Sequence, residues 1–305
     1  MVVASALALA GCGVLPASPG PVPALPGYSV ELTQVPFFPQ EKHQCGPAAL
    51  AMALSAAGER VTPEQLVPEV YLPGREGSLQ AEMLAGARRH GLVAFPLAGG
   101  LDALHAELMA ETPVIVLQNL GLDWLPRWHY AVVVGYDATS RQMILRSGLT
   151  ERLTLDLDVF DASWRGSGRW AMLALPPGRL PVSASAGSYL QAVVALEKAG
   201  QARAAQASYR AAAGRWPDNL VAWMGLGNTS HALGDLSGAE GAFREAVQRH
   251  PDSAAALNNL AQVLADGRRY PEAIEAARAA VRLGGRDAAT AQRTLETILA
   301  QSEGR

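Results

Sequence analysis

The sequence is poor in cysteine, because its 305 residues include only Cys12 and Cys45. A small disulfide-bonded scaffold needs many more, so this class of protein is excluded. The chain also lacks a cluster of cysteines and histidines with the spacing of a zinc site. No glycine-rich segment has the pattern of a phosphate-binding loop. We therefore expect neither a metal nor another cofactor.

Charge of either sign is not in excess, because 25 lysines and arginines face 28 aspartates and glutamates. Such a balance gives no electrostatic reason to expect nucleic acid or an anionic membrane surface as a partner. Beyond the N-terminal segment, no apolar run approaches the roughly 20 residues that a membrane-spanning helix needs. The chain is long enough for two domains.

The first twelve residues form an apolar stretch of mostly small side chains that ends in Leu9-Ala10-Gly11-Cys12. This pattern is typical of an export signal and is too short for a transmembrane helix. Its last four residues resemble the lipobox of bacterial lipoproteins, in which the cysteine becomes the acylated first residue. Because no lysine or arginine precedes the apolar stretch, we expect translation to start upstream of Met1.

We accordingly expect a signal peptide over residues 1–12, lipidation at Cys12 and a proline-rich linker over residues 13–30. Proline-rich segments form semi-extended spacers, so this linker would hold the next domain away from a membrane. The resemblance to lipoproteins implies a bacterial cell-envelope protein. We expect it to be lipid-anchored on the periplasmic face of the outer membrane.

Cys45 stands at the start of a predicted helix and has no obvious disulfide partner. Residues 48–57 are rich in strong helix formers, Pro47 suits a first helical turn, and Gly58 suits the position just past a helix end. Unpaired N–H groups and the positive end of the helix dipole favour a thiolate at such a position. Cys45 is therefore a candidate nucleophile. The alternative is a small buried hydrophobe, as many free cysteines are.

His129 opens an apolar run over residues 130–136 that is typical of a buried strand. A turn over residues 137–142 and a short strand over residues 143–145 would complete a hairpin that brings Ser147 opposite His129. An imidazole at this place is a candidate general base. The alternative is a strand-end histidine that bonds to the backbone.

Gln40 lies five residues before Cys45, and its amide is a candidate donor to an oxyanion, together with the N–H group of Cys45. The alternative is an ordinary solvated glutamine. Of the remaining histidines, we expect His43 to point away from this site, and His90 and His105 to lie on the surface of helical segments.

Two strings together resemble the bacteriocin-processing peptidases, a family of papain-like cysteine peptidases: Gln40-x4-Cys45-Gly-Pro-Ala-Ala and His129-Tyr-Ala-Val-Val-Val-Gly-Tyr-Asp137. The resemblance covers about residues 31–177. It implies that Cys45 is the nucleophile, His129 the general base and Gln40 the oxyanion donor. It also implies cleavage after small residues such as paired glycines.

The sequence departs from that family at the third catalytic position. Family members commonly carry an aspartate on the strand after the histidine, whereas this chain has Arg146-Ser147-Gly148 there. Ser147 would orient the imidazole more weakly than a carboxylate would; Asp137 or a water molecule is the alternative. A cysteine–histidine pair without a carboxylate still works, because cysteine is the least demanding nucleophile.

Helical patterns precede β-type patterns in the first half of the chain. The helical ones follow Thr62 and span residues 78–90 and 101–109, and the β-type ones include residues 113–117 and 170–175. This order predicts an α+β domain, which the resemblance makes papain-like. Trp124 and Trp128 precede His129 in a loop, where they would either line a substrate groove or cap the core.

A period of 34 residues appears from residue 189 onward, where alanine dominates. The period relates Tyr189 to Trp223 and Leu257, Tyr209 to Phe243 and Ala277, and Pro217 to Pro251. These strings resemble tetratricopeptide repeats. The resemblance implies an all-α solenoid of about three repeats over residues 188–290, followed by a tail over residues 291–305. We expect a linker over residues 178–187 and a hinge at residues 181–188, which are rich in small residues.

The leading interpretation is an exported, lipid-anchored cysteine peptidase whose repeats bind the protein substrate or a protein partner, since stacked repeats form a concave binding surface. An alternative from another class is a catalytically weak or inactive scaffold with a peptidase fold that assembles an envelope protein complex. A third interpretation, acyl transfer to an amine in place of water, would use the same residues.

Overall fold

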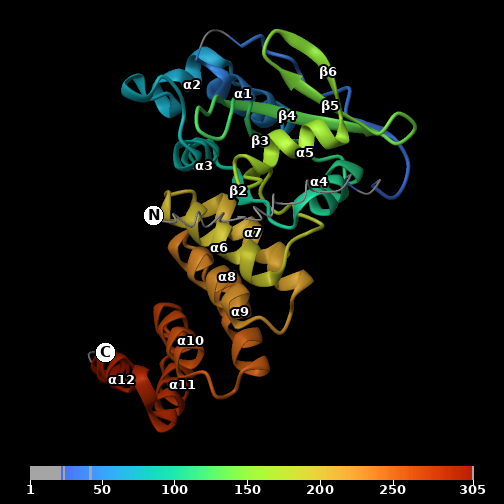
Figure 1. The fold of residues 1–305 in the computed structure, drawn as a ribbon. Coiled ribbons are helices and arrows are strands. Elements are labelled where there is room, and N and C mark those ends of the chain that lie inside the picture. The colour runs from blue at the N-terminus through green and yellow to red at the C-terminus, as the bar shows by residue number, and fades with distance from the viewer. Residues whose placement is uncertain (1–21, 23–24, 41–42, 304–305) are drawn as a thin grey trace, which may run out of the picture.

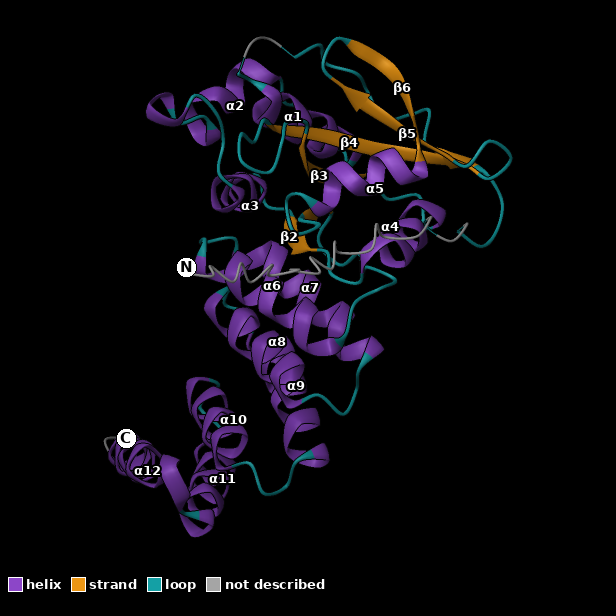
Figure 2. Cartoon of the chain, in the orientation of Figure 1, coloured by secondary structure: helices purple, strands orange, loops and turns teal. Residues whose placement is uncertain are grey.

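The computed structural model describes residues 22, 25–40 and 43–303. The predicted signal peptide, Cys12 and most of the proline-rich linker lie outside these residues. The first half of the chain forms a sheet with helices on both faces, and the second half forms a column of helices (Figure 1). We name these halves the sheet domain and the repeat domain. Figure 2 shows that strands are confined to the sheet domain, as the sequence pattern predicts.

Among the described residues, seven strands form one sheet in the order β2-β7-β3-β4-β5-β6, with β1 paired to β4, and every pair is antiparallel. The strands are β1 (Val30–Glu31), β2 (Val93–Pro96), β3 (Val114–Asn119), β4 (Trp128–Asp137), β5 (Gln142–Ser147), β6 (Thr150–Asp156) and β7 (Ala171–Leu175). The hairpin predicted after His129 is the β4–β5 pair.

Helices cover both faces of this sheet. One face carries α1 (Cys45–Ala56), α2 (Pro63–Val70) and α3 (Gln80–Arg89), and the other carries α4 (Gly100–Met109) and α5 (Leu157–Arg165). Because side chains alternate along β4, Tyr130 and Val132 pack toward α1, whereas Ala131 and Val133 pack toward the opposite face. A strand covered on both faces is apolar throughout, which explains the uninterrupted run after His129. The predicted α+β class is confirmed.

Helix α1 begins at Cys45 and is buried from Gly46 to Leu54. It ends where predicted, because Gly58 has a left-handed φ of 100° just past the helix. Gly46 is required by close packing: a Cβ atom there would lie 2.2 Å from Oγ of Ser78. The loop after the short 3-10 helix η1 (Pro73–Arg75) therefore approaches the start of α1 closely.

The repeat domain contains three consecutive helix pairs within its described residues, which confirms the predicted repeats. They are α6 (Ala186–Lys198) with α7 (Ala202–Arg215), α8 (Leu220–Ala232) with α9 (Leu236–Arg249), and α10 (Ala254–Asp266) with α11 (Tyr270–Leu283). The segment expected as a tail forms most of helix α12 (Ala288–Glu303), which follows the short η2 (Gly285–Asp287). Helix α12 packs on α10 and α11 and buries Ile298. No helix in the described ranges is both long and apolar enough to cross a bilayer.

The two domains share one hydrophobic core. Tyr189 and Val193 of α6 belong to the same buried cluster as Val93 of β2 and Leu173 of β7. The segment between the domains is also fixed by a polar contact: the buried carboxylate of Glu107 accepts hydrogen bonds from N (2.9 Å) and Oγ (2.6 Å) of Ser183. The hinge expected at residues 181–188 is therefore wrong, because this segment is packed and bonded.

Substitution of two glycines in the repeat helices tests how closely these helices pack. A Cβ atom on Gly227 of α8 would lie 2.4 Å from the ring of Phe243, whereas a Cβ atom on Gly241 of α9 would meet nothing within 4 Å. We expect Gly227→Ala to lower the free energy of unfolding by about 1–3 kcal/mol because it overpacks the core. Gly241→Ala should raise it by about 0.5–1 kcal/mol, because glycine is a poor helix residue. Urea unfolding measures both, and a stabilising Gly227→Ala would contradict the packing described.

Candidate active site

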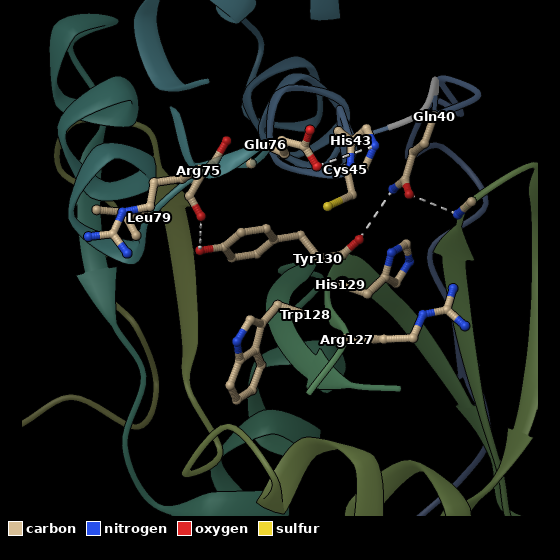
Figure 3. Close-up of a pocket in the computed structure, with 13 residues that line it drawn as sticks. Gln40, His43, Cys45, Arg75, Glu76, Leu79, Arg127, Trp128, His129 and Tyr130 are labelled. Atoms are coloured by element: carbon tan, nitrogen blue, oxygen red, sulfur yellow. Dashed lines mark hydrogen bonds and ion pairs between the residues drawn. The ribbon is translucent and has the colours of Figure 1, made fainter. Parts of the chain in front are cut away.

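A cavity of about 680 Å³ lies where the start of α1, the start of β4 and the loop after η1 meet (Figure 3). Gln40, Cys45 and His129, which are distant in sequence, all line it. Ser147 directly precedes Gly148, which also lines the cavity. The structure thus brings the four residues predicted for catalysis to one place.

Cys45 is the first residue of α1, and its thiol is free. Burial raises the pKa of the Cys45 thiol above its ordinary value, and backbone hydrogen bonds from Tyr130, Gly46 and Cys45 itself partly offset this effect. Burial disfavours the charged form, so the resting residue at neutral pH is a thiol. A base must therefore remove its proton before it attacks.

The imidazole of His129 is held by Ser147. Its Nε2 lies 2.8 Å from Oγ of Ser147, which is buried at the end of β5. Burial lowers the pKa of His129, and the nearby Arg127 cation lowers it further. A neutral imidazole is competent to accept a proton, so His129 suits the role of general base.

Nδ1 is the ring nitrogen of His129 that remains open for Cys45. No hydrogen bond joins the sulfur of Cys45 to the imidazole, although both side chains are within the described part of the chain and line the same cavity. Catalytic contacts are often long in unliganded enzymes and tighten when substrate binds. When Oγ of Ser147 accepts a hydrogen bond from Nε2–H, the neutral tautomer of His129 has an unprotonated Nδ1, which can act as the base.

Gln40 joins three parts of the site. Its Oε1 accepts a hydrogen bond from N of Gly148 (3.0 Å), and its Nε2 donates to the carbonyl oxygen of Tyr130 (3.3 Å). Its backbone N also donates to O of Gly148 (3.0 Å). Because Oε1 faces a backbone donor, the orientation of the amide is fixed by its partners. Gln40 is buried and not solvated, and its second Nε2 hydrogen remains available to an oxyanion.

Asp137 does not support His129. It lies at the other end of β4, where its carboxylate accepts hydrogen bonds from the turn residues Thr139 and Ser140 and from Ser29. Asp137 is therefore excluded as the residue that orients the imidazole of His129.

Two predictions about the other histidines are wrong. His43 was expected to point away, yet it lines the cavity with its Nε2 3.9 Å from a carboxylate oxygen of Glu76. His43 and Glu76 both have left-handed backbones, with φ values of 65° and 47°, and such residues gather at functional sites. His105 is only 6% exposed, although a surface position was expected. His90 lies 3.2 Å from Glu69 and is partly buried.

Two aromatic side chains of β4, Trp128 and Tyr130, form part of the cavity wall. The hydroxyl of Tyr130 donates to the carbonyl oxygen of Ser78 (3.3 Å), which connects the two walls (Figure 3). Trp128 lines the cavity and is 53% exposed. It therefore lies along a groove and does not cap the core. Trp124 is 78% exposed and caps no core.

Comparisons with known proteins agree with this architecture. Residues 32–172 match the Peptidase_C39 like family, and residues 190–252 and 232–288 match the tetratricopeptide repeat. The chain therefore contains a C39-like peptidase-family domain followed by tetratricopeptide repeats. No curated protein matches the chain.

Solved structures resemble the two domains separately. One is described as a C39-like peptidase from Bacillus anthracis, with 20% identity over 49% of this chain and 98% of that chain and a TM-score of 0.42. Another is the Yersinia enterocolitica type III secretion chaperone SycD in complex with a peptide of the translocator YopD, with 15% identity over 38% and 92% and a TM-score of 0.36. SycD alone gives 15% identity over 40% and 90% and a TM-score of 0.37.

Ser147 provides a test of how His129 is held. We expect Ser147→Asp to raise the pKa of His129, because a carboxylate beside Nε2 stabilises the imidazolium. The matched variant Ser147→Asn accepts the same hydrogen bond without the charge and should leave the pKa low. An NMR titration of the His129 ring measures both. An unchanged pKa in a folded Ser147→Asp protein would show that residue 147 does not contact the imidazole.

Proposed function

We propose that this protein is a cysteine peptidase in which Cys45 is the nucleophile and His129 the general base. The observation that carries the proposal is the convergence of Cys45, His129 and Gln40 from three separate segments on one cavity. The thiol stands at a helix start, where backbone N–H groups have no partner within the helix. The match of residues 32–172 to a peptidase family supports the same chemistry.

Acylation would proceed by transfer of the thiol proton to Nδ1 of His129 as the sulfur attacks the peptide carbonyl carbon. The oxyanion that forms would accept hydrogen bonds from N of Cys45 and from Nε2 of Gln40. His129 would then give the proton to the nitrogen of the leaving peptide, and the C–N bond would break. The product of this half-reaction is a thioester on Cys45 and a free amine.

Deacylation would use the same groups in reverse order. A water molecule enters beside His129, which removes a proton as the oxygen attacks the thioester carbonyl. The C–S bond breaks, the sulfur of Cys45 recovers the proton, and a carboxylic acid leaves. An amine in place of water would give acyl transfer with the same residues.

A catalytically weak or inactive scaffold is the second candidate function. The observation in its favour is the hydroxyl of Ser147 behind the imidazole. A hydroxyl does not stabilise the imidazolium that forms during acylation, whereas a carboxylate does. The raised pKa of Cys45 acts in the same direction, because it disfavours the thiolate.

We also propose cleavage after small residues such as paired glycines. Tyr130 and Ser78 lie on the boundary between this cavity and a neighbouring one, and their hydrogen bond spans the space beside Cys45. A substrate residue bound against this bridge has little room for a side chain. The resemblance to bacteriocin-processing peptidases supports the same preference.

The repeats would bind the protein substrate or a partner protein. Stacked helix pairs form a concave surface, and the shared core around Tyr189 fixes that surface relative to the cavity. A rigid junction would present a bound protein to Cys45 in one orientation.

We further propose that a lipid on Cys12 anchors the protein in a bacterial cell envelope, on the periplasmic face of the outer membrane. Val22, in the middle of the proline-rich linker, donates a hydrogen bond from its N atom to Asp158 (2.7 Å) and accepts one from Arg141 at its O atom (2.5 Å). The linker would therefore leave the domain beside α5, and nine residues would separate Val22 from Cys12.

Cleavage of a peptide library that contains paired glycines, followed by mass spectrometry, tests the peptidase. We expect Cys45→Ala to abolish cleavage and to leave the fold unchanged, because only the sulfur is lost. Gln40→Ala should lower kcat about 10²–10³-fold, which is about 2.7–4 kcal/mol of transition-state stabilisation. Cleavage by Cys45→Ala at the wild-type rate would rule out covalent catalysis.

Membrane fractionation tests the anchor. We expect the full-length protein to sediment with membranes, because the several acyl chains of a lipoprotein give stable anchoring. Cys12→Ser should release soluble protein or leave an uncleaved precursor. A cleaved Cys12→Ser protein that stays in the membrane fraction would contradict anchoring through this residue.

A further inference from the structure

In the proposed reaction, one side of the cavity binds the substrate residues that follow the scissile bond. In the proposed reaction His129 gives its proton to the leaving amine, so residues that follow the scissile bond must lie beside His129. Arg127 precedes His129 by two residues, just before β4, and both side chains line the cavity. Figure 3 shows Arg127 beside His129, on the side of the cavity opposite Arg75 and Leu79.

Arg127 carries a charge that no carboxylate neutralises. Within the described part of the chain, its guanidinium forms no ion pair or hydrogen bond. The acidic residue of the cavity, Glu76, lies instead near His43. The Arg127 cation nevertheless acts on the site, because it contributes to the lowered pKa of His129.

The backbone of Arg127 is held firmly despite the exposure of its side chain. Its N atom donates to Oδ1 of Asn119 (2.9 Å), and its O atom accepts from N of Leu120 (2.9 Å). The same Asn119 oxygen accepts a hydrogen bond from N of Gly121 (3.0 Å). The backbone that carries the cation is thus fixed in position just before β4.

We propose that Arg127 selects substrates with a carboxylate in the first residues after the scissile bond. This inference rests on the proposed peptidase function and names a substrate class for it. A guanidinium recognises carboxylates in bidentate geometry, and an exposed cation on one side of a cavity attracts negatively charged groups to that side. The carboxylate belongs either to an acidic side chain or to the C-terminus of the leaving fragment.

Matched peptides distinguish these sources. They carry Glu, Gln or Lys at the first or second position after the scissile bond, each with an amidated or a free C-terminus. We expect wild-type kcat/KM to be about two- to fivefold higher for Glu than for Lys, as for an exposed ion pair. A preference that follows the free C-terminus, and not Glu, assigns the carboxylate to the chain end.

Variants of the full chain then assign the preference to Arg127. The Glu-to-Lys ratio of kcat/KM within one variant cancels any change in the basicity of His129. We expect Arg127→Gln to bring this ratio close to one and Arg127→Glu to invert it. The matched control, Arg75→Gln on the opposite wall, should keep the wild-type ratio. An unchanged ratio in Arg127→Gln, or equal cleavage of all wild-type peptides, would overturn the proposal.

Alkylation of Cys45 tests the same cation without peptide cleavage. The measured quantity is the rate with iodoacetate divided by the rate with iodoacetamide, compared with the same ratio for a free cysteine amide. We expect a higher ratio in the wild type and a fall in Arg127→Gln, but not in Arg75→Gln. A wild-type ratio equal to that of the free thiol would refute the role of Arg127. A protein that cleaves no peptide yet shows the expected ratios would instead refute the peptidase.

Discussion

The hydrogen bonds of Gln40 are the constraint on which the site depends. They join the loop that precedes Cys45 to the carbonyl of Tyr130 in β4 and to Gly148 after β5. The Cys45 thiol adds a further polar contact between the start of α1 and this hairpin, because it is hydrogen-bonded to the backbone of Tyr130. A buried amide with fixed partners also positions its remaining hydrogen, so in the proposed mechanism Gln40 serves both structure and chemistry. Gly46 contributes to the same arrangement, because the absence of a Cβ atom lets the loop that carries Ser78 approach the start of α1.

Burial sets the electrostatic character of the site. It raises the pKa of Cys45 and lowers the pKa of His129, so both groups rest in their neutral forms. A neutral thiol and a neutral imidazole suit proton transfer during attack, in contrast to a preformed ion pair. Ser147 fits this arrangement, because its hydroxyl bonds a neutral ring without drawing a proton to it. In the proposed reaction, this hydroxyl would stabilise the imidazolium of His129 less than a carboxylate would.

Local patterns were enough to predict much of the fold and the core of the site. The helix after Cys45, the hairpin after His129 and the 34-residue period each depend on residues close in sequence. The contact of Ser147 with His129 also followed from hairpin geometry. The position of His43 did not, because a left-handed backbone in a loop leaves no periodic signal. The role of Tyr130 was hidden for a different reason, since its bond to Ser78 joins segments 52 residues apart.

The junction between the domains was also mispredicted, because its contacts join residues far apart in sequence. Small residues at positions 181–188 indicated a hinge, but the buried Glu107 that bonds Ser183 comes from α4, far away in sequence. Tyr189 was interpreted only as a repeat packing residue, although it also packs in the core of the sheet domain. Arg127 lies in the loop just before His129, four residues after Asp123. Its place beside His129 gained meaning only when the opposite wall, with Glu76 near His43, was known.

The proposed reaction requires the sulfur of Cys45 to form a thioester with the substrate. The most direct measurement is intact-mass spectrometry of the protein after acid quenching during turnover of a peptide ester, whose fast acylation lets the intermediate accumulate. We predict a mass increase equal to the acyl fragment, located on Cys45 by peptide mapping and removed by neutral hydroxylamine. Hydrolysis of the ester with Cys45 unmodified at every quench time, or with the adduct on another residue, would contradict the account.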